Sequence, residues 1–313
     1  MAQHQLSDAE SAEVARRWSE HTSASDAFST EVYWLAVLEV YRRHQFRMTG
    51  SRDGNWVEFV VCEYLPHPLP VERILSLGCG DGSLERTLAA LGAFRECDAW
   101  DLSPGAIEQA ASEARRAGFQ HIDYKVADLN RLQSPDATYD AVWFNGSLHH
   151  VSALEHVLDQ VRRTLKPQGR LVLNEYVGPS RFAFTPRQKE AISAAFALIP
   201  KRLRRSCFPE NRGAFVEHPP IPDPANVRAA DPSEAVRSAE IMDAVRERFD
   251  LVLHRQAGGT ILQFLLSGIA GNFQACDEGA MRVLTMLFEI EDALVDSGDL
   301  QSDFVLVVAT PRR

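Results

Sequence analysis

The stretch Ile74-Leu75-Ser76-Leu77-Gly78-Cys79-Gly80-Asp81-Gly82-Ser83 decides the fold of this chain. It begins with residues that suit a buried strand and continues with glycines at alternate positions. Glycine permits a positive φ, a tight turn and a close approach of the backbone to a ligand. Residues 84–91 have the pattern of a helix that ends at Gly92. A strand, a glycine turn and a helix N-terminus together predict a cradle for a nucleoside-bearing ligand.

An acidic residue supports this interpretation of the glycine turn. Asp101 comes nineteen residues after Gly82, at the end of a second short strand predicted over 97–101. A carboxylate at about this distance after the glycines is what ribose hydroxyls need as a hydrogen-bond acceptor. The alternative is that Asp101 only caps the helix that follows Ser103.

Composition limits the class of protein. The 313 residues carry 33 basic and 43 acidic side chains, a net charge of −10, which argues against broad nucleic-acid binding. The five cysteines are widely spaced and form no CxxC, so we expect no disulfide framework and no zinc site. No motif requires a metal, and the open alternative is a cation recruited by Glu175 with a diphosphate substrate. The polar N-terminus and the lack of a long apolar stretch predict a cytoplasmic protein without a membrane segment.

Strands and helices alternate from residue 73 onward. Strands are expected at 73–77, 97–101, 122–126, 141–144, 170–174, 250–254 and 303–309. Ser103 and Pro104 begin one helix, Thr185 and Pro186 another, and Ser152 with Glu155 forms a capping box for a third. The segment Asp231-Pro232-Ser233-Glu234 has the same pattern of a helix start. This rhythm predicts an α/β fold, a Rossmann-like, mainly parallel, seven-stranded sheet with helices on both faces.

The remaining segments are expected to surround this sheet. We predict an N-terminal helical extension over 1–69, a core over 70–177 and a helical cap over 178–248, inserted after the fifth strand. Residues 249–313 would return to the core and bring further helices. A locally basic run in the insertion suits either an anionic substrate or, more often, a solvated helix face; it includes Arg181, Lys201, Arg202, Arg204, Arg205 and Arg212.

Several motifs stand in a familiar order and spacing. They are Leu75–Gly82, Asp101–Ser103, Ala127–Leu129, Tyr139–Val142 with Leu148–His150, and Leu165–Leu171. In these blocks the chain resembles the class I S-adenosylmethionine-dependent methyltransferases, over about residues 70–177. A nicotinamide-dependent oxidoreductase is disfavoured, because the G-x-G-x-x-G spacing fails at its third glycine.

The resemblance implies S-adenosyl-L-methionine as the cofactor and assigns its contacts. The glycines would let the backbone pass beneath the methionine moiety, Asp101 would bind both ribose hydroxyls, and Asp128 with the Leu129 N–H would bind adenine. Asn145 would lie beside the methionyl part and the sulfonium. The family often has an acid where Ser76 stands, so another group must meet the cofactor's ammonium. The implied cofactor-binding residues are Ser76, Gly78, Cys79, Gly80, Gly82, Asp101, Leu102, Asp128, Leu129 and Asn145.

The catalytic residues are expected beyond the carboxyl ends of the strands, where open parallel sheets bind ligands. Glu175 is the first candidate, as a base, an orienting group or a stabiliser of positive charge. His149 is the second and Tyr176 the third. A structural carboxylate and a packed histidine are the alternatives. At most one of the adjacent residues His149 and His150 is expected to face the site.

The predicted function is methyl transfer from S-adenosylmethionine to an oxygen, nitrogen or carbon atom of a small organic molecule, such as an anionic or secondary metabolite. The caps would enclose the acceptor and exclude water. A methyltransferase of RNA or protein would need an open, basic face. A scaffold protein that has lost catalysis would show damaged cofactor motifs, and only Ser76 departs here. No nucleic-acid or membrane partner is expected, and the sequence does not fix the oligomeric state.

Overall fold

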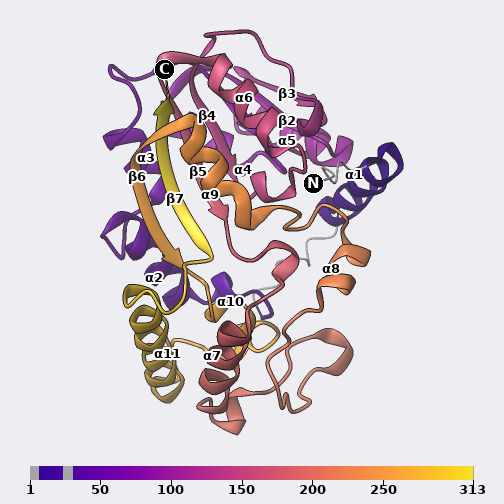
Figure 1. The fold of residues 1–313 in the computed structure, drawn as a ribbon, viewed down its shortest axis with the longest axis vertical. Coiled ribbons are helices and arrows are strands. Elements are labelled where there is room, and N and C mark those ends of the chain that lie inside the picture. The colour runs from indigo at the N-terminus through magenta and orange to yellow at the C-terminus, as the bar shows by residue number, and fades with distance from the viewer. Residues whose placement is uncertain (1–6, 24–30, 313) are drawn as a thin grey trace.

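A computed structural model describes residues 7–23 and 31–312. Its centre is a seven-stranded sheet in the order β3-β2-β1-β4-β5-β7-β6 (Figure 1). The first five strands run parallel, and β7 is antiparallel to both β5 and β6. This confirms the predicted Rossmann-like, mainly parallel sheet. The strands are β1 (Val71–Leu77), β2 (Phe94–Asp101), β3 (Ile122–Val126), β4 (Tyr139–Asn145), β5 (Leu165–Tyr176), β6 (Phe249–Gly258) and β7 (Phe304–Pro311).

Helices cover both faces of the sheet because successive residues of a strand point to opposite sides. Ile74 of β1 faces the core formed with α3 and α4, whereas Leu75 and Leu77 face the core formed with α6 and α9. The helices are α1 (Asp8–Ser23), α2 (Leu38–Thr49), α3 (Trp56–Glu63), α4 (Ser83–Ala90), α5 (Pro104–Arg116), α6 (Leu154–Thr164), α7 (Pro186–Ala197), α8 (Pro224–Ala230), α9 (Ile241–Arg248), α10 (Leu262–Leu266) and α11 (Glu278–Asp296).

A third core lies beyond the carboxyl ends of the parallel strands (Figure 1). It joins Val40 of α2, Phe196 of α7, Leu265 of α10 and Leu287 of α11, each almost fully buried. Segments from the N-terminal extension, the insertion after β5 and the last third of the chain therefore pack into one cap. The predicted boundaries of the four regions stay a prediction.

The predicted capping box at Ser152 is wrong. Helix α6 begins at Leu154, and its N-cap residue, Ala153, has no side-chain cap. The N–H and hydroxyl of Ser152 both donate to Asn130 Oδ1, at 2.9 and 3.0 Å. Glu155 instead receives two hydrogen bonds from Arg237. The contacts of Ser152 with Asn130 and of Glu155 with Arg237 have thus replaced the local capping interaction.

The predicted helix start at Asp231 is also wrong, because residues 231–236 form turns. Arg181 explains this: its guanidinium donates to the carbonyl oxygens of Asp231, Pro232 and Glu234. These contacts hold the segment as turns, in which the Asp231 carbonyl oxygen accepts both Arg181 and the Glu234 N–H, an i to i+3 bond. The predicted caps Ser103 and Thr185 do accept from Ala106 and Gln188, as expected.

No helix in the described part of the chain is long and apolar enough to span a bilayer.

Candidate functional site

The glycine turn joins β1 to α4 with a backbone that only glycine adopts easily. Gly78, Gly80 and Gly82 have φ values of 73°, 54° and 78°. A Cβ at Gly78 would lie 2.4 Å from the Cβ of Ser147, and one at Gly82 would lie 2.6 Å from Tyr124 Oη. A Cβ at Gly80 would meet nothing within 4 Å. Gly78 and Gly82 are therefore required by packing, whereas Gly80 borders open space where a ligand can approach the backbone.

Asp101 lies at the end of β2, directly beside this turn. Its Oδ2 accepts the Gly80 N–H at 2.9 Å, and its Oδ1 accepts the Ser103 N–H at 2.8 Å. Burial raises the pKa of this carboxyl above its usual value. Each oxygen keeps a second lone pair for a ribose hydroxyl. The turn and Asp101 thus fit the nucleoside end of S-adenosylmethionine, and Ser103, rather than Asp101, is the helix cap.

The other predicted cofactor contacts lie at the same edge of the sheet. Asp128 follows β3 and accepts the Asn130 N–H at 2.9 Å, which holds Leu129 at the start of a 3-10 turn. Asn145 ends β4, and its Oδ1 accepts a hydrogen bond from Asn174 Nδ2 at 2.8 Å. Cys79 and Leu102 flank the glycine turn and Asp101. Their contacts to a cofactor stay a prediction.

Ser76 is buried in β1, and sequence reasoning missed the acid beside it. Glu85 of α4 is fully buried, and neither carboxylate oxygen has a hydrogen-bond partner among the described residues. Burial raises the pKa of Glu85 to about 7, and the Ser76 hydroxyl opposes that shift. Glu85 follows Leu84 in helix α4. The hydrophobic periodicity of this helix alone gives no sign that the Glu85 side chain points inward.

Glu175, the first catalytic candidate, is buried near the end of β5. Its Oε2 accepts the backbone N–H groups of Ser147 and Leu148, at 2.9 and 2.7 Å. Its Oε1 accepts the Tyr176 N–H and meets His149 Nδ1. Burial opposes ionisation, but His149 and the backbone N–H donors prevail and hold the pKa of Glu175 below its usual value. The carboxylate is therefore an acceptor that orients His149.

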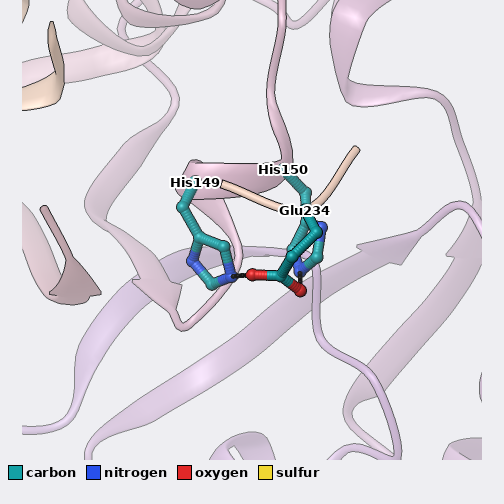
Figure 2. A group of neighbouring side chains, drawn as sticks. All are labelled: His149, His150 and Glu234. Atoms are coloured by element: carbon teal, nitrogen blue, oxygen red, sulfur yellow. Dashed lines mark ion pairs between the residues drawn. The ribbon is translucent and has the colours of Figure 1, made fainter. Parts of the chain in front are cut away.

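His149, which contacts Glu175, converges with His150 and Glu234 (Figure 2). His149 Nε2 lies 3.7 Å from Glu234 Oε1, and His150 Nε2 lies 3.9 Å from Glu234 Oε2. The two imidazole rings are side by side, with centroids 4.2 Å apart. A 3-10 turn over Leu148–His150 directs both rings at one carboxylate, while the expectation that at most one of them faces the methyl-transfer site stays a prediction.

The two histidines differ in charge preference. Burial opposes protonation of His149, but the Glu175 carboxylate outweighs it and raises the pKa to about 9. Burial, with the charge on His149 next, lowers the pKa of His150 below its usual value. His150 opposes the burial that raises the pKa of Asp101, so the cluster acts electrostatically on the predicted ribose site.

Tyr176 follows Glu175 and forms part of an aromatic wall. Its hydroxyl donates to the Pro179 carbonyl oxygen at 3.1 Å, and burial raises its pKa well above the usual value. Its ring contacts Phe182 and Phe304, with centroid separations of 5.1 and 5.4 Å. The predicted catalytic role of Tyr176 stays a prediction; the geometry presents it as a packing group.

The basic run of the insertion is held by the protein itself. Arg202 pairs with Asp277 at 2.6 Å, and Arg212 pairs with Glu31 at 2.5 Å. Arg204 donates to the Ile199 carbonyl oxygen, at the end of the α7 segment. These contacts support a structural role rather than a site for an anionic substrate.

Glu234 is the residue of this cluster that the sequence did not reveal. It stood in a segment with the pattern of a helix start, 59 residues beyond Glu175. Only the turn fixed by Arg181 brings its carboxylate to the histidines. A locally acidic DPSE segment after a proline-rich loop was the single available signal.

Comparison with known proteins identifies the central part of the chain. Residues 75–173 match the family described as a methyltransferase domain. This part of the chain is thus similar to a methyltransferase domain, in agreement with the resemblance that its motifs carry. This domain includes the glycine turn, Asp101, Asp128 and the two histidines, while the cap lies outside it.

Two curated relatives illustrate the similarity. The demethylmenaquinone methyltransferase of Tropheryma whipplei is 32% identical over 146 residues, which are 47% of this chain and 58% of that protein. The ubiquinone biosynthesis O-methyltransferase of Methylocella silvestris is 42% identical over 126 residues, which are 40% of this chain and 42% of that protein. The chain thus spans about half the length of the curated relatives it matches.

A solved structure extends the similarity of fold to the whole chain. The geranyl diphosphate C-methyltransferase of Streptomyces coelicolor A3(2) aligns over 100% of both chains, with a TM-score of 0.54 and 14% identity. That structure contains Mg²⁺, a geranyl diphosphate analogue and S-adenosyl-L-homocysteine. At this identity the match shows the shared fold alone.

Proposed function

We propose that this protein transfers a methyl group from S-adenosyl-L-methionine to a small organic molecule. The observation that carries the proposal is the open face of Gly80 beside the Asp101 carboxylate, within a matched methyltransferase domain. The glycine turn would carry the methionine part of the cofactor, and Asp101 would bind its ribose. Asp128 and the Leu129 N–H would bind the adenine, and Asn145 would lie by the sulfonium.

The acceptor side is proposed to lie between this edge of the sheet and the cap. Ser147 links the two sides: its hydroxyl donates to the Leu77 carbonyl oxygen at 2.6 Å, and its N–H donates to Glu175. Glu175 acts as a positioning residue, because its oxygens already accept several hydrogen bonds. His149 presents Nε2 toward the acceptor, and Tyr176 lines the wall. Methyl transfer from a sulfonium depends mainly on such alignment.

A small acceptor is favoured over a macromolecule. The cap core packs beyond the carboxyl ends of the parallel strands, and the net charge of −10 disfavours a nucleic-acid substrate. The curated relatives are named for quinone substrates, which are small molecules. The free cysteines of the described chain support a reducing, cytoplasmic location. These features support no specific oligomeric state.

An acceptor screen with methyl-labelled S-adenosylmethionine tests the proposal. Purified protein is incubated with small-molecule acceptors, including quinols and isoprenoid diphosphates, and label is followed into product by mass spectrometry. We expect label in a small molecule and its loss in Asp101→Ala. Label found only in added RNA or protein, or no label with a protein that binds the cofactor, would contradict the proposal.

A further inference from the structure

The group formed by His149, His150 and Glu234 has an unusual pattern of donors and acceptors. Ser233 has a single hydroxyl hydrogen, which it donates to Asp231 Oδ1 at 2.7 Å. His150 Nδ1 lies 2.9 Å from the same hydroxyl oxygen. This nitrogen must therefore donate its hydrogen to Ser233, which leaves a lone pair on Nε2 of the neutral ring.

The same reasoning applies to His149. Its Nδ1 contacts Glu175 Oε1, and an ionised carboxylate only accepts hydrogen bonds. Nδ1 of His149 is thus the donor, and Nε2 is the ring atom that a metal ion would bind, in place of the second proton that the Glu175 carboxylate favours on this ring. Both Nε2 atoms face the carboxylate of Glu234, which is an acceptor (Figure 2).

The two Nε2 atoms and the Glu234 carboxylate face one another, an arrangement that either a proton on an imidazole or a metal ion can satisfy. Among the described residues, no donor lies within hydrogen-bond distance of the Glu234 carboxylate; Arg181 donates only to its backbone carbonyl oxygen. A proton shared between His149 and Glu234 would draw the two atoms to about 2.8 Å. The observed separations of 3.7 and 3.9 Å are longer than a hydrogen bond.

We propose that His149, His150 and Glu234 bind a first-row divalent transition-metal ion. All three ligand atoms lie within 4.8 Å of one another. Ligands at about 2.1 Å from a tetrahedral ion are about 3.4 Å apart, and each Nε2 lies within roughly half an ångström of that separation from the Glu234 oxygen it faces, Oε1 for His149 and Oε2 for His150. Two imidazoles and one carboxylate suit Zn²⁺, Co²⁺ or Fe²⁺ better than Mg²⁺.

The surroundings are those of a built site. Each histidine is oriented by a hydrogen bond from its other ring nitrogen, to Glu175 or to the Ser233–Asp231 pair, as in many protein metal centres. The ligand side chains are 12%, 19% and 27% exposed, for His149, His150 and Glu234. An ion held there keeps an open coordination position toward solvent or an oxygen of a small molecule.

This proposal differs from the sequence analysis, which assigned no metal ligand. Adjacent histidines lack the spacing of common metal motifs, and the third ligand is 84 residues further along the chain. The proposal goes beyond methyl transfer and does not depend on it. An ion at this position would bind an acceptor oxygen next to the cofactor site.

Metal titration of the chelator-treated full chain tests the proposal. Zn²⁺ is added in a calorimeter, and Co²⁺ is followed by its visible absorption. We expect one equivalent to bind, with Mg²⁺ at least 100-fold weaker than Zn²⁺. His150→Gln and Glu234→Gln should each weaken Zn²⁺ binding by 100-fold or more. Ser233→Ala, which removes only the orienting hydroxyl, should weaken it by about 10- to 100-fold.

His254→Gln serves as the matched control, since His254 is an exposed histidine on β6. This change should leave metal affinity within twofold of the parent protein. Absence of stoichiometric binding by the folded protein, or binding that survives both His150→Gln and Glu234→Gln, would overturn the proposal. Circular dichroism confirms that each variant is folded. Calorimetry with S-adenosylmethionine on the same samples separates failure of this site from failure of the methyltransferase proposal.

Discussion

Replacing Glu85 by glutamine should make the protein more stable at alkaline pH. The carboxyl group of Glu85 is fully buried, with only the Ser76 hydroxyl opposing the effect of burial among nearby side-chain hydrogen-bonding groups, and its pKa of about 7 lies above the ordinary value of 4.5. Between these two pH values the folded protein holds a proton that the unfolded chain has lost. The free energy of unfolding therefore falls as pH rises through this window.

The magnitude follows from the size of the shift. A difference of about 2.5 pKa units corresponds to about 3 kcal/mol of stability lost above pH 7. The amide of glutamine does not ionise. The difference in the free energy of unfolding between Glu85→Gln and the parent should therefore be smallest at pH 4.5 and increase as pH rises. For 313 residues this amounts to a melting temperature about 5 °C higher for the variant at pH 8.

Thermal and urea unfolding of the cofactor-free protein between pH 4.5 and 8 measures this difference. Glu58→Gln is the matched control, because Glu58 is also the third residue of its helix, α3, but is exposed. Its stability should stay within about 0.5 kcal/mol of the parent at every pH. Parallel profiles for Glu85→Gln and the parent across this range would refute the account of Glu85.

Two further predictions concern a buried histidine and the glycine turn. Burial lowers the pKa of His44 to about 4, so this residue should reduce stability as pH falls from 6.5 to 4, the reverse of Glu85; acid unfolding of His44→Asn should lack this loss, and an unchanged slope would contradict it. Gly78→Ala should impair folding because its Cβ would clash with Ser147, whereas Gly80→Ala should fold but bind S-adenosylmethionine at least tenfold more weakly. Circular dichroism and calorimetry separate the two glycines, and equal behaviour of both variants would argue against the assigned geometry.

The opposing trends of Glu85 and His44 have a joint consequence. From pH 4.5 to 6.5 the folded state is favoured by acid through Glu85 and disfavoured by acid through His44. Each group changes the number of protons bound on unfolding by about one, and with opposite sign. Their contributions to the pH dependence of the free energy of unfolding therefore nearly cancel in the parent protein. Removing either group should expose the slope of the other, which a pH profile of the parent alone cannot reveal.

The sequence predicted the sheet because its strands and turns are encoded locally. Glycines at 78, 80 and 82 and the acid at 101 act within one strand–turn–helix unit, and a family match covers that unit. The segment 231–234 has an equally good local pattern for a helix. Arg181, fifty residues earlier, instead donates hydrogen bonds to carbonyl oxygens of this segment and holds it as turns. The helix propensity of a short segment contains no information about hydrogen bonds from a residue so far away in the sequence.

The residues of the candidate site also differ in whether the local sequence predicts them. Glu175 and His149 were found because they follow strands whose carboxyl ends meet at one edge. Glu234 and Glu85 were not, since their importance arises from burial and from the donors around them. The fold, rather than the spacing of residues in the sequence, determines which acceptors lie at hydrogen-bond distance from a donor.

Binding of S-adenosyl-L-homocysteine to the folded protein tests the central claim most directly. Titration calorimetry should show one site per chain, and Asp101→Ala should weaken binding at least tenfold because both ribose hydroxyls lose their acceptor. Asp123→Ala, a change one strand away on β3, should leave the affinity unchanged. Failure of the folded parent protein to bind either this product or S-adenosylmethionine would contradict the account.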